Sequence, residues 1–190
     1  DYGPATKLIP TLLASGPDDR LIVVDDDRIY HRHFVEQMVG LADAHPGTAV
    51  AGSGWDAPED RIDRPSTLAA TLRGDPPVPL HCTRVGRGSQ VDIVRGASGY
   101  LVTPGFFDRH GLVNYAGAPE AAFFVDDVWI SAHCVAPKFV WPGRRTNFPA
   151  LADRGFFEPS SLGSINCTGP DENRNNTTML RYFTERWGRR

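Results

Sequence analysis

The feature that most constrains the fold of this chain is a short apolar run that ends in three consecutive acidic residues. Residues 21–24 have the sequence LIVV, and Asp25, Asp26 and Asp27 follow directly. A run this rich in β-branched residues and bounded by charge is typical of a buried strand in a mostly parallel sheet. Open α/β sheets bind ligands beyond the carboxyl ends of their strands, so we expect the aspartates to lie at a binding site.

The spacing of the three aspartates indicates how they could act. Side chains alternate along an extended segment, so Asp25 and Asp27 are expected on one side and Asp26 on the other. Two carboxylates on one side of a strand end suit a hard cation, Mn²⁺ or Mg²⁺, that carries substrate phosphates. The alternative is a solvated acidic turn in which an aspartate caps the next helix. We favour the metal site because adjacent like charges repel one another unless a cation or hydrogen-bond donors offset them.

The size and composition of the chain fit one globular domain. Its 190 residues are enough for a hydrophobic core, and we place a single domain over residues 1–190. A formal net charge of -3 argues against a basic nucleic-acid-binding surface, so we expect no nucleic-acid partner. No apolar stretch approaches the roughly 20 residues that a membrane helix needs, so we expect no membrane segment. Cys82, Cys134 and Cys167 are widely spaced, which favours buried free thiols.

Helical and extended patterns alternate along the start of the chain, an order that favours α/β architecture. We predict helices at 5–14, 31–44, 126–136 and 173–187, and strands at 21–24, 48–51, 80–85, 91–94, 100–103 and 138–141. Proline and glycine interrupt residues 52–78, so we expect an irregular surface segment there.

A second acidic pair, Asp126 and Asp127, follows the apolar residues 123–125, which we interpret as another strand end. On the helix that begins here, Asp126 shares one face with Trp129 and His133. A carboxylate, a large aromatic ring and an imidazole together could stack on a sugar and move a proton. Taken singly, each has an ordinary explanation as a helix cap, a core residue or a packed histidine. The two acidic centres suggest a division of labour, with the first holding a metal and a phosphorylated substrate and the second supplying a base.

In their order along the chain, these segments resemble a GT-A glycosyltransferase of the kind grouped in glycosyltransferase family 2. Residues 3–8 (GPATKL) resemble the Gly-rich helix start whose basic residue lies near the nucleotide, and residues 24–27 (VDDD) resemble the DxD motif. Residues 95–100 (RGASGY) resemble the small-residue segment beside the donor sugar and acceptor. Residues 125–127 (VDD) resemble the acidic dipeptide whose second member is the catalytic base, although the usual Glu is Asp126 here.

The resemblance implies a GT-A, Rossmann-like mixed sheet with flanking helices. The opening strand–helix–strand of that fold would precede residue 1, so we expect this chain to lack those N-terminal strands and to be a fragment of a longer protein. The implied activity is metal-dependent transfer of a sugar, with inversion, from a nucleotide-diphosphate sugar to an acceptor hydroxyl. We expect a UDP-sugar as the donor and a glycan or another hydroxyl compound as the acceptor.

The resemblance also implies roles for individual residues. Asp25 and Asp27 would hold the Mn²⁺ or Mg²⁺ ion. The donor nucleotide-sugar would be bound by Lys7, Asp25, Asp26 and Gly99. Asp127 would be the base; helical spacing favours Asp126 for that role and the family pattern favours Asp127, which we choose. Trp129 and His133 would bind the acceptor.

Two other functions compete with this interpretation. A haloacid-dehalogenase-like phosphatase also has an Asp-x-Asp strand end and a late acidic pair, but that resemblance needs a lysine between them. Lys7 precedes both acidic centres and Lys138 follows both, and arginine does not readily replace lysine there. The non-enzymatic alternative is a catalytically degenerate carbohydrate-binding module in which Trp129 and other exposed aromatic residues stack on sugar rings.

Overall fold

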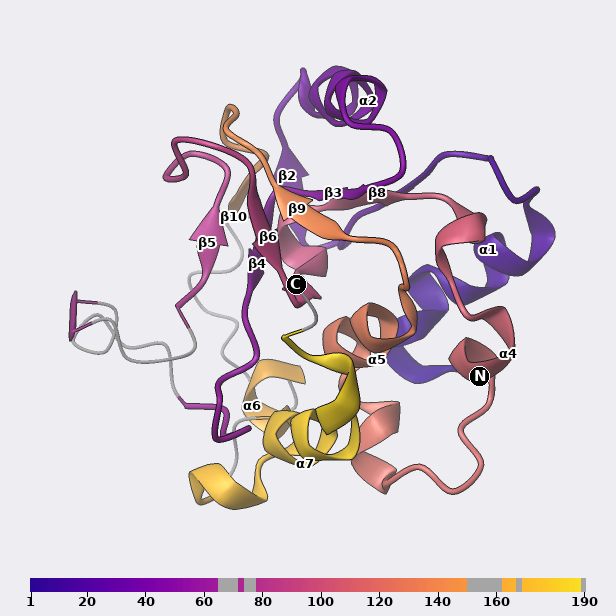
Figure 1. Ribbon diagram of the computed structural model, residues 1–190, viewed down its shortest axis with the longest axis vertical. Helices are drawn as coiled ribbons and strands as arrows, with labels where there is room; N and C mark the ends of the chain where they lie inside the picture. Colours follow the sequence, from indigo (N-terminus) through magenta and orange to yellow (C-terminus); the bar gives the residue numbers. More distant parts are fainter. Residues whose placement is uncertain (65–71, 74–77, 150–161, 167–168, 189–190) are drawn as a thin grey trace.

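A five-stranded mixed sheet lies at the centre of the molecule, in a computed structural model that describes residues 1–64, 72–73, 78–149, 162–166 and 169–188 (Figure 1). The strands, in their order across the sheet, are β1 (Leu21–Val23), β8 (Tyr100–Val102), β3 (Ala49–Ala51), β9 (Lys138–Val140) and β6 (Ser89–Val91). β3 and β9 are parallel, and the other neighbours are antiparallel. With helices on both faces, this confirms the predicted α/β class with a mixed sheet and flanking helices.

β1 forms where the apolar run predicts a strand, but its setting differs from the prediction. It lies at one end of the strand order and pairs antiparallel with β8, with Ile22 opposite Leu101. Within the described residues it has this single neighbour, and Val24, just beyond it, is 42% exposed. The expectation of a buried strand in a mostly parallel sheet is therefore wrong. A local apolar pattern reports burial of side chains and not the direction of the neighbouring strand.

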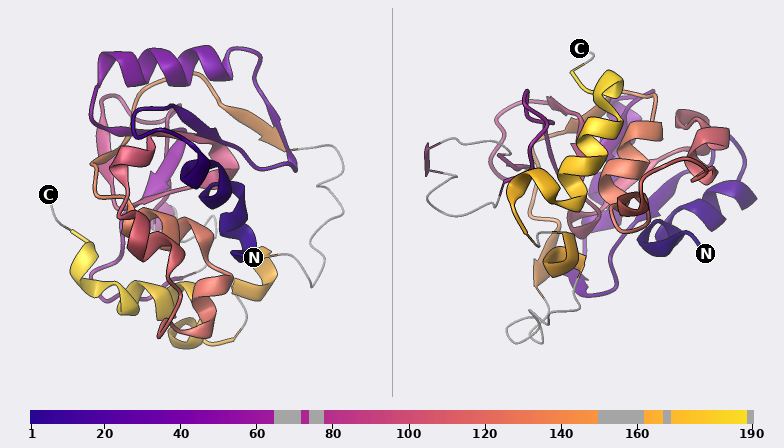
Figure 2. Two further views of the ribbon diagram at one scale, coloured as in Figure 1. Left: turned by 90° about the vertical axis from the view of Figure 1, so that its right-hand side faces the viewer. Right: turned by 90° about the horizontal axis from the view of Figure 1, so that it is seen from below.

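Two hydrophobic clusters lie on opposite faces of this sheet (Figure 2). α2 (Phe34–Ala44) covers one face, where Phe34 and Met38 pack with Val50 and Leu101. The other face is covered by α1 (Ile9–Ala14), α5 (Asp126–His133) and α7 (Asn175–Tyr182), as Figures 1 and 2 show. Side chains alternate along a strand, so residues adjacent to Leu101 in β8 point into the second cluster.

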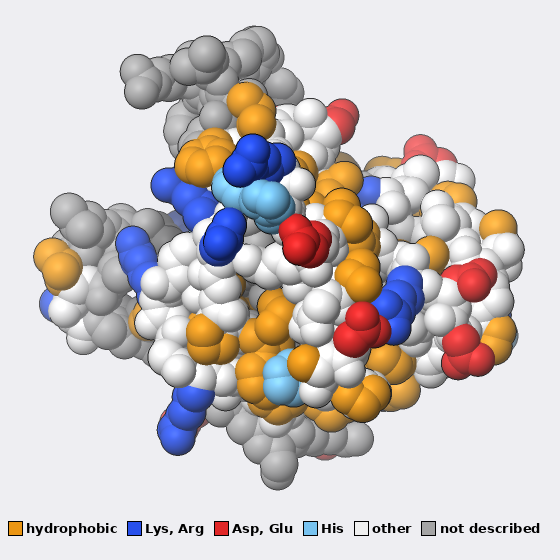
Figure 3. All heavy atoms as spheres, turned by 90° about the horizontal axis from the view of Figure 1, so that it is seen from above, with side chains coloured by type: hydrophobic (Ala, Val, Ile, Leu, Met, Phe, Trp, Pro, Cys, Tyr) orange, Lys and Arg blue, Asp and Glu red, His pale blue; other side chains and the backbone are white. Residues whose placement is uncertain are grey.

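The solvent face of α2 is of mixed character. Seen from above, hydrophobic side chains are scattered over this side of the molecule, and a group of basic and histidine side chains lies among them (Figure 3). Val35 is 57% exposed, and Arg32, His33 and Arg144 line a hollow beside the helix. α2 therefore contributes only its inner stripe to the core.

Two small sheets extend the fold beyond the five central strands. β4 (Ser53–Trp55) lies between β5 (Leu80–His81) and β7 (Ile93–Val94), all antiparallel. β2 (Arg28–Tyr30) pairs with β10 (Asn147–Pro149). β2, β4 and β10 were not predicted, and β4 occupies part of the segment expected to be irregular; residues 65–71 and 74–77 of that segment lie outside the described residues. These short strands lack enough residues for a clear two-residue alternation.

The first predicted helix is divided into two. η1 (Gly3–Lys7) is a 3₁₀ helix, and α1 begins after Leu8 with Pro10 in its first turn. Proline has no N–H to continue an earlier helix, so it is accommodated where a helix starts anew. The remaining short helices are η2 (Gly96–Ser98), η3 (Pro104–Phe106), α4 (Arg109–Val113), η4 (Glu120–Phe123), α6 (Leu162–Asn166), η6 (Asp171–Asn173) and η7 (Thr184–Arg186).

Two further expectations concern cysteines and membranes. Cys82 and Cys134 are buried free thiols, as predicted, and Cys167 lies outside the described residues. In the described part of the chain, no helix has the length and apolar character needed to cross a bilayer.

Candidate active site

The two acidic centres meet in one cleft of about 600 Å³. Its walls come from η1, the turn after β1, the residues around η2, the start of α5 and α6. The acidic side chains that line it are Asp25, Asp26, Asp27, Asp126 and Asp127. Segments about a hundred residues apart in the chain therefore supply one strongly acidic site, and all five of these aspartates were candidates from the sequence.

Lys7 joins the two acidic centres. Its Nζ lies 2.7 Å from Asp25 Oδ1 and 2.7 Å from Asp126 Oδ2. η1 reaches this position because Ala5 and Leu8 are buried in the same hydrophobic cluster as the residues of α5. Burial lowers the pKa of Lys7, but the charges of Asp127, Asp126 and Asp25 raise it, and the net shift is upward. Lys7 therefore stays protonated and offsets part of the negative charge of the cleft.

Asp127 differs electrostatically from its neighbour Asp126. Its Oδ1 accepts a hydrogen bond of 2.9 Å from the backbone N–H of Gly96. Desolvation, and then the charge of Asp126, raise the pKa of Asp127 to about 7, against the opposing effects of Lys7 and the Gly96 N–H. Asp127 can therefore gain or lose a proton near neutral pH, whereas Asp126 is held in an ion pair with Lys7.

Gly96 permits this close arrangement. A Cβ atom at this position would lie 2.2 Å from Lys7 Nζ and 3.0 Å from Asp25 Oδ1, so a side chain here would displace the ion pair. The backbone N–H of the same residue donates to Asp127. The small-residue segment 95–100 thus contributes to the cleft through Gly96, although Gly99 was the glycine singled out from the sequence.

Gly99 itself does not line the cleft. It has φ of +72°, and a Cβ atom there would lie 2.4 Å from Phe34 Cζ. The residue is needed where the backbone passes closely over the inner face of α2. Its placement indicates a packing role and gives no support to donor binding.

Trp129 and His133 also lie away from the cleft, in the hydrophobic core. Trp129 is 1% exposed, its Nε1 donates a 2.9 Å hydrogen bond to the Leu112 carbonyl, and its ring stacks on Tyr115 at 4.2 Å between centroids. Burial is the main cause that lowers the pKa of His133 to about 4, so its imidazole is neutral at physiological pH. The helical spacing did bring the two rings together, with 4.7 Å between their centroids, but on the side of α5 that faces the core. Neither ring is available to an acceptor.

The three aspartates after β1 provide oxygen ligands at the cleft. Asp26 and Asp27 are exposed, and Asp27 Oδ1 lies 3.3 Å from Arg28 Nε. Among the described residues no group of three or more His, Cys, Asp or Glu side chains is arranged to hold a metal ion. A Mg²⁺ or Mn²⁺ ion that arrives with a diphosphate needs only one or two carboxylates, because phosphate oxygens and water complete its coordination. Asp25 and Asp27 could supply these carboxylates; Asp25 also pairs with Lys7 and Asp27 with Arg28, so a bound ion would share them with those side chains.

Three residues of the site were missed by sequence reasoning. The Tyr30 hydroxyl accepts a 3.0 Å hydrogen bond from the Asp25 backbone N–H and so fixes the acidic turn. Arg95 lines the cleft, and so does Asn166, whose amide nitrogen donates to the Phe124 carbonyl at 2.9 Å. None of the three had a clear local signal: the strand Arg28–Tyr30 is too short to show a two-residue alternation, and the segment 95–100 was selected for its small residues.

The second acidic pair is not at a strand end, and this corrects the prediction. Residues 120–123 form η4, after Pro119, and α5 starts at Asp126. The phosphatase alternative required two acidic strand ends, and Asp126 and Asp127 start a helix instead. The sugar-binding alternative named Trp129 together with other exposed aromatic residues; Trp129 is buried and cannot stack on a sugar, whereas Phe123, Phe148 and Tyr182 are exposed. The geometry favours neither.

No protein-family model matches this chain, and a search of curated proteins finds no match. Any function proposed for the chain therefore depends on its own residues and their geometry.

Proposed function

We propose that this protein is a GT-A-like glycosyltransferase that transfers a sugar from a nucleotide-diphosphate sugar to an acceptor hydroxyl. The observation that carries the proposal is the meeting, in one cleft, of four segments in the chain order of that family. These are η1 with Lys7, the turn with Asp25 and Asp27, the segment with Gly96, and the start of α5 with Asp127.

Asp127 is assigned the role of general base. With a pKa of about 7 it is largely ionised just above neutral pH and is basic enough to accept the proton of an acceptor hydroxyl. As that proton moves to Asp127, the acceptor oxygen bonds to the anomeric carbon and the bond from this carbon to the diphosphate breaks. Direct displacement inverts the anomeric centre. The Gly96 N–H holds the carboxylate in position, and Asp126 is unsuited to the role because its charge is paired with Lys7.

The negative charge of the diphosphate requires cations in a cleft lined by five aspartates. Asp25 and Asp27 are the residues that would hold Mn²⁺ or Mg²⁺, which when bound acts as a Lewis acid on the leaving diphosphate. Lys7 offsets one of the two negative charges of Asp25 and Asp126, which lowers the repulsion that the diphosphate would otherwise meet. Arg95, at the edge of the cleft, adds a second positive charge.

The test is release of nucleoside diphosphate from UDP- and GDP-sugars, with Mn²⁺ and a panel of sugar acceptors, by the wild type and the Asp127→Asn variant. Asparagine can still accept the Gly96 hydrogen bond but cannot take a proton. We expect acceptor-dependent release to fall by about 10²–10⁴-fold. The control is Asp43→Asn, an exposed aspartate paired with Arg20, which should retain wild-type turnover. Equal turnover in the two variants, or hydrolysis of simple phosphate esters in place of sugar transfer, would contradict the proposal.

A further inference from the structure

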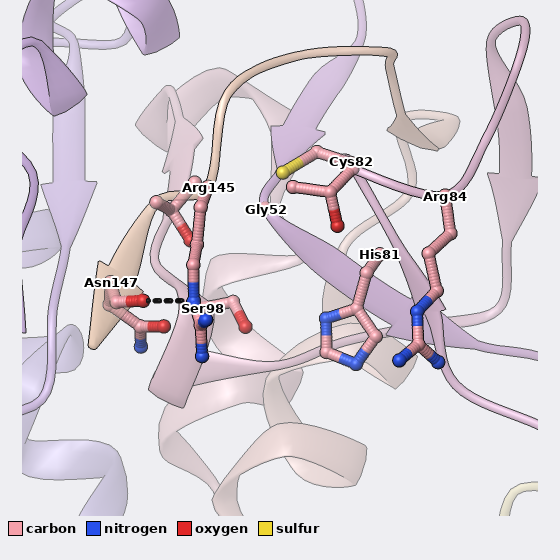
Figure 4. A pocket seen from close by; sticks show the side chains of 9 residues that line it. Gly52, His81, Cys82, Arg84, Ser98, Arg145 and Asn147 are labelled. Carbon is pink, nitrogen blue, oxygen red and sulfur yellow. Dashed lines mark hydrogen bonds between the residues drawn. The ribbon is translucent and has the colours of Figure 1, made fainter. Parts of the chain in front are cut away.

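A second pocket, of about 240 Å³, lies beside the acidic cleft and has the opposite charge (Figure 4). Its charged lining residues are Arg84 and Arg145, with His81 of β5 between them; we call it the basic pocket. Figure 4 shows the side chains of Arg145, His81 and Arg84 extending to the same side. The hydroxyl-bearing residues Thr83, Ser98 and Thr146 also line it, together with Asn147.

The positive charge of the basic pocket has no carboxylate to balance it within the described part of the chain. No Asp or Glu lines the pocket, and neither Arg84 nor Arg95 forms an ion pair with a described residue. Arg145 packs over the Phe148 ring and donates from Nε to the Asn147 carbonyl at 2.9 Å. Burial, and then the charges of Arg95, Arg84 and Arg145, lower the pKa of His81. The His81 imidazole therefore lies in the positive field of three guanidinium groups.

The basic pocket and the acidic cleft share a wall. Arg95 and Ala97 line the cleft, and Ser98, in the same segment, lines the basic pocket. The Asn147 amide donates to the Ala97 carbonyl and so ties β10 to this wall. On the other side, Ser98 Oγ accepts a buried 2.7 Å hydrogen bond from Ser53 Oγ. Hydrogen bonds from Asn147 and Ser53 therefore fix the segment that separates the two pockets. A ligand that spans this segment would contact both the acidic cleft and the basic pocket.

We infer that the basic pocket binds an anionic group, a carboxylate, sulfate or phosphate, carried by the acceptor. Guanidinium groups bind these planar or tetrahedral anions through paired hydrogen bonds, and the neighbouring hydroxyls and amide supply further donors. The assignment to the acceptor depends on the transferase proposed above, in which the donor diphosphate lies in the acidic cleft. An acidic acceptor would be repelled by the five aspartates there unless its anion were held on the far side of the wall.

The test separates anion binding from transfer. Sulfate, glucuronate and glucose are titrated calorimetrically into the wild type and into an Arg84→Gln/Arg145→Gln double variant. We expect glucuronate and sulfate to bind the wild type and glucose not to, with at least about tenfold weaker anion binding in the double variant, since both guanidiniums are lost. An Arg20→Gln variant controls for net charge, because Arg20 lies on the surface in a pair with Asp43. Both pocket arginines are exposed, so the double variant is expected to keep the wild-type melting temperature.

Three results would distinguish the possibilities. Anion affinity that falls equally in the Arg20→Gln control and the double variant would overturn the inference. A loss of affinity for UDP with Mn²⁺ in the double variant, without a loss for glucuronate, would assign the basic pocket to the donor and overturn the acceptor assignment. Anion binding is expected to survive in Asp127→Asn, because it needs no turnover. If the transferase proposal fails while anion binding holds, the basic pocket remains an anion site and only its assignment to the acceptor is lost.

Discussion

Replacing Asp127 with asparagine is expected to remove transfer activity and to stabilise the fold at the same pH. The pKa of this carboxyl is raised from 3.8 to about 7 in the folded protein, mainly because the group is desolvated. Each pKa unit corresponds to about 1.4 kcal/mol, so the ionised carboxylate costs the fold up to about 4 kcal/mol above neutral pH. Asparagine has no charge to desolvate and keeps the hydrogen bond from Gly96.

The sign of the pH dependence follows from the direction of this shift. The folded protein binds the Asp127 proton more tightly than the unfolded chain does, so the wild-type free energy of unfolding loses this contribution as the pH rises from about 4 to about 7. Asp127→Asn should therefore resemble the wild type near pH 4 and exceed it by up to about 4 kcal/mol near pH 8. Urea unfolding at the two pH values measures both differences. A stability difference that is the same at both would refute the desolvated-carboxylate explanation.

Three other substitutions test the surroundings of the cleft. Lys7→Gln leaves Asp25 and Asp126 without their cation and should lower the free energy of unfolding by about 2–4 kcal/mol at neutral pH. Urea unfolding measures the loss, and an unchanged free energy of unfolding would contradict the ion-pair account. Gly99→Ala should lower the free energy of unfolding by more than about 1 kcal/mol, measured by thermal unfolding. The loss should exceed that of Gly47→Ala, because Gly47 also has a positive φ but has open space around it. Trp129→Phe should lower the free energy of unfolding by about 1–3 kcal/mol, because a hydrogen bond and buried volume are lost, and should leave the KM for the acceptor unchanged. A raised KM would show that the indole does contribute to acceptor binding.

The sequence predicted those features of the fold that depend on local patterns. The strands at 100–102 and 138–140 and the helix α2 formed where apolar periodicity placed them. The direction of β1 and the order of strands were not predictable in this way, because pairing depends on residues far along the chain. The division of the first helix at Leu8 was visible in principle, since Pro10 can stand only near a helix start.

The site was predicted in part, for a similar reason. The acidic residues were found because each group is contiguous in sequence and follows an apolar run. Helical spacing correctly placed Trp129 beside His133, but spacing alone does not tell whether a face meets a cleft or a core. The basic pocket had no local signal, because His81 and Arg84 meet Arg145 only after some sixty residues of intervening chain have folded.

Calorimetric titration of UDP and GDP, with and without Mn²⁺, tests the transferase proposal most directly. The account predicts that one nucleoside diphosphate binds the wild type only with the metal, that Asp27→Ala abolishes this binding, and that the exposed-site control Asp43→Ala retains it. Asp127→Asn should also bind, because its change affects the proton transfer and not the diphosphate. Binding that is equally strong without metal, or that survives in Asp27→Ala, would contradict the assigned role of the acidic turn, and no binding of either nucleotide would contradict the proposed function.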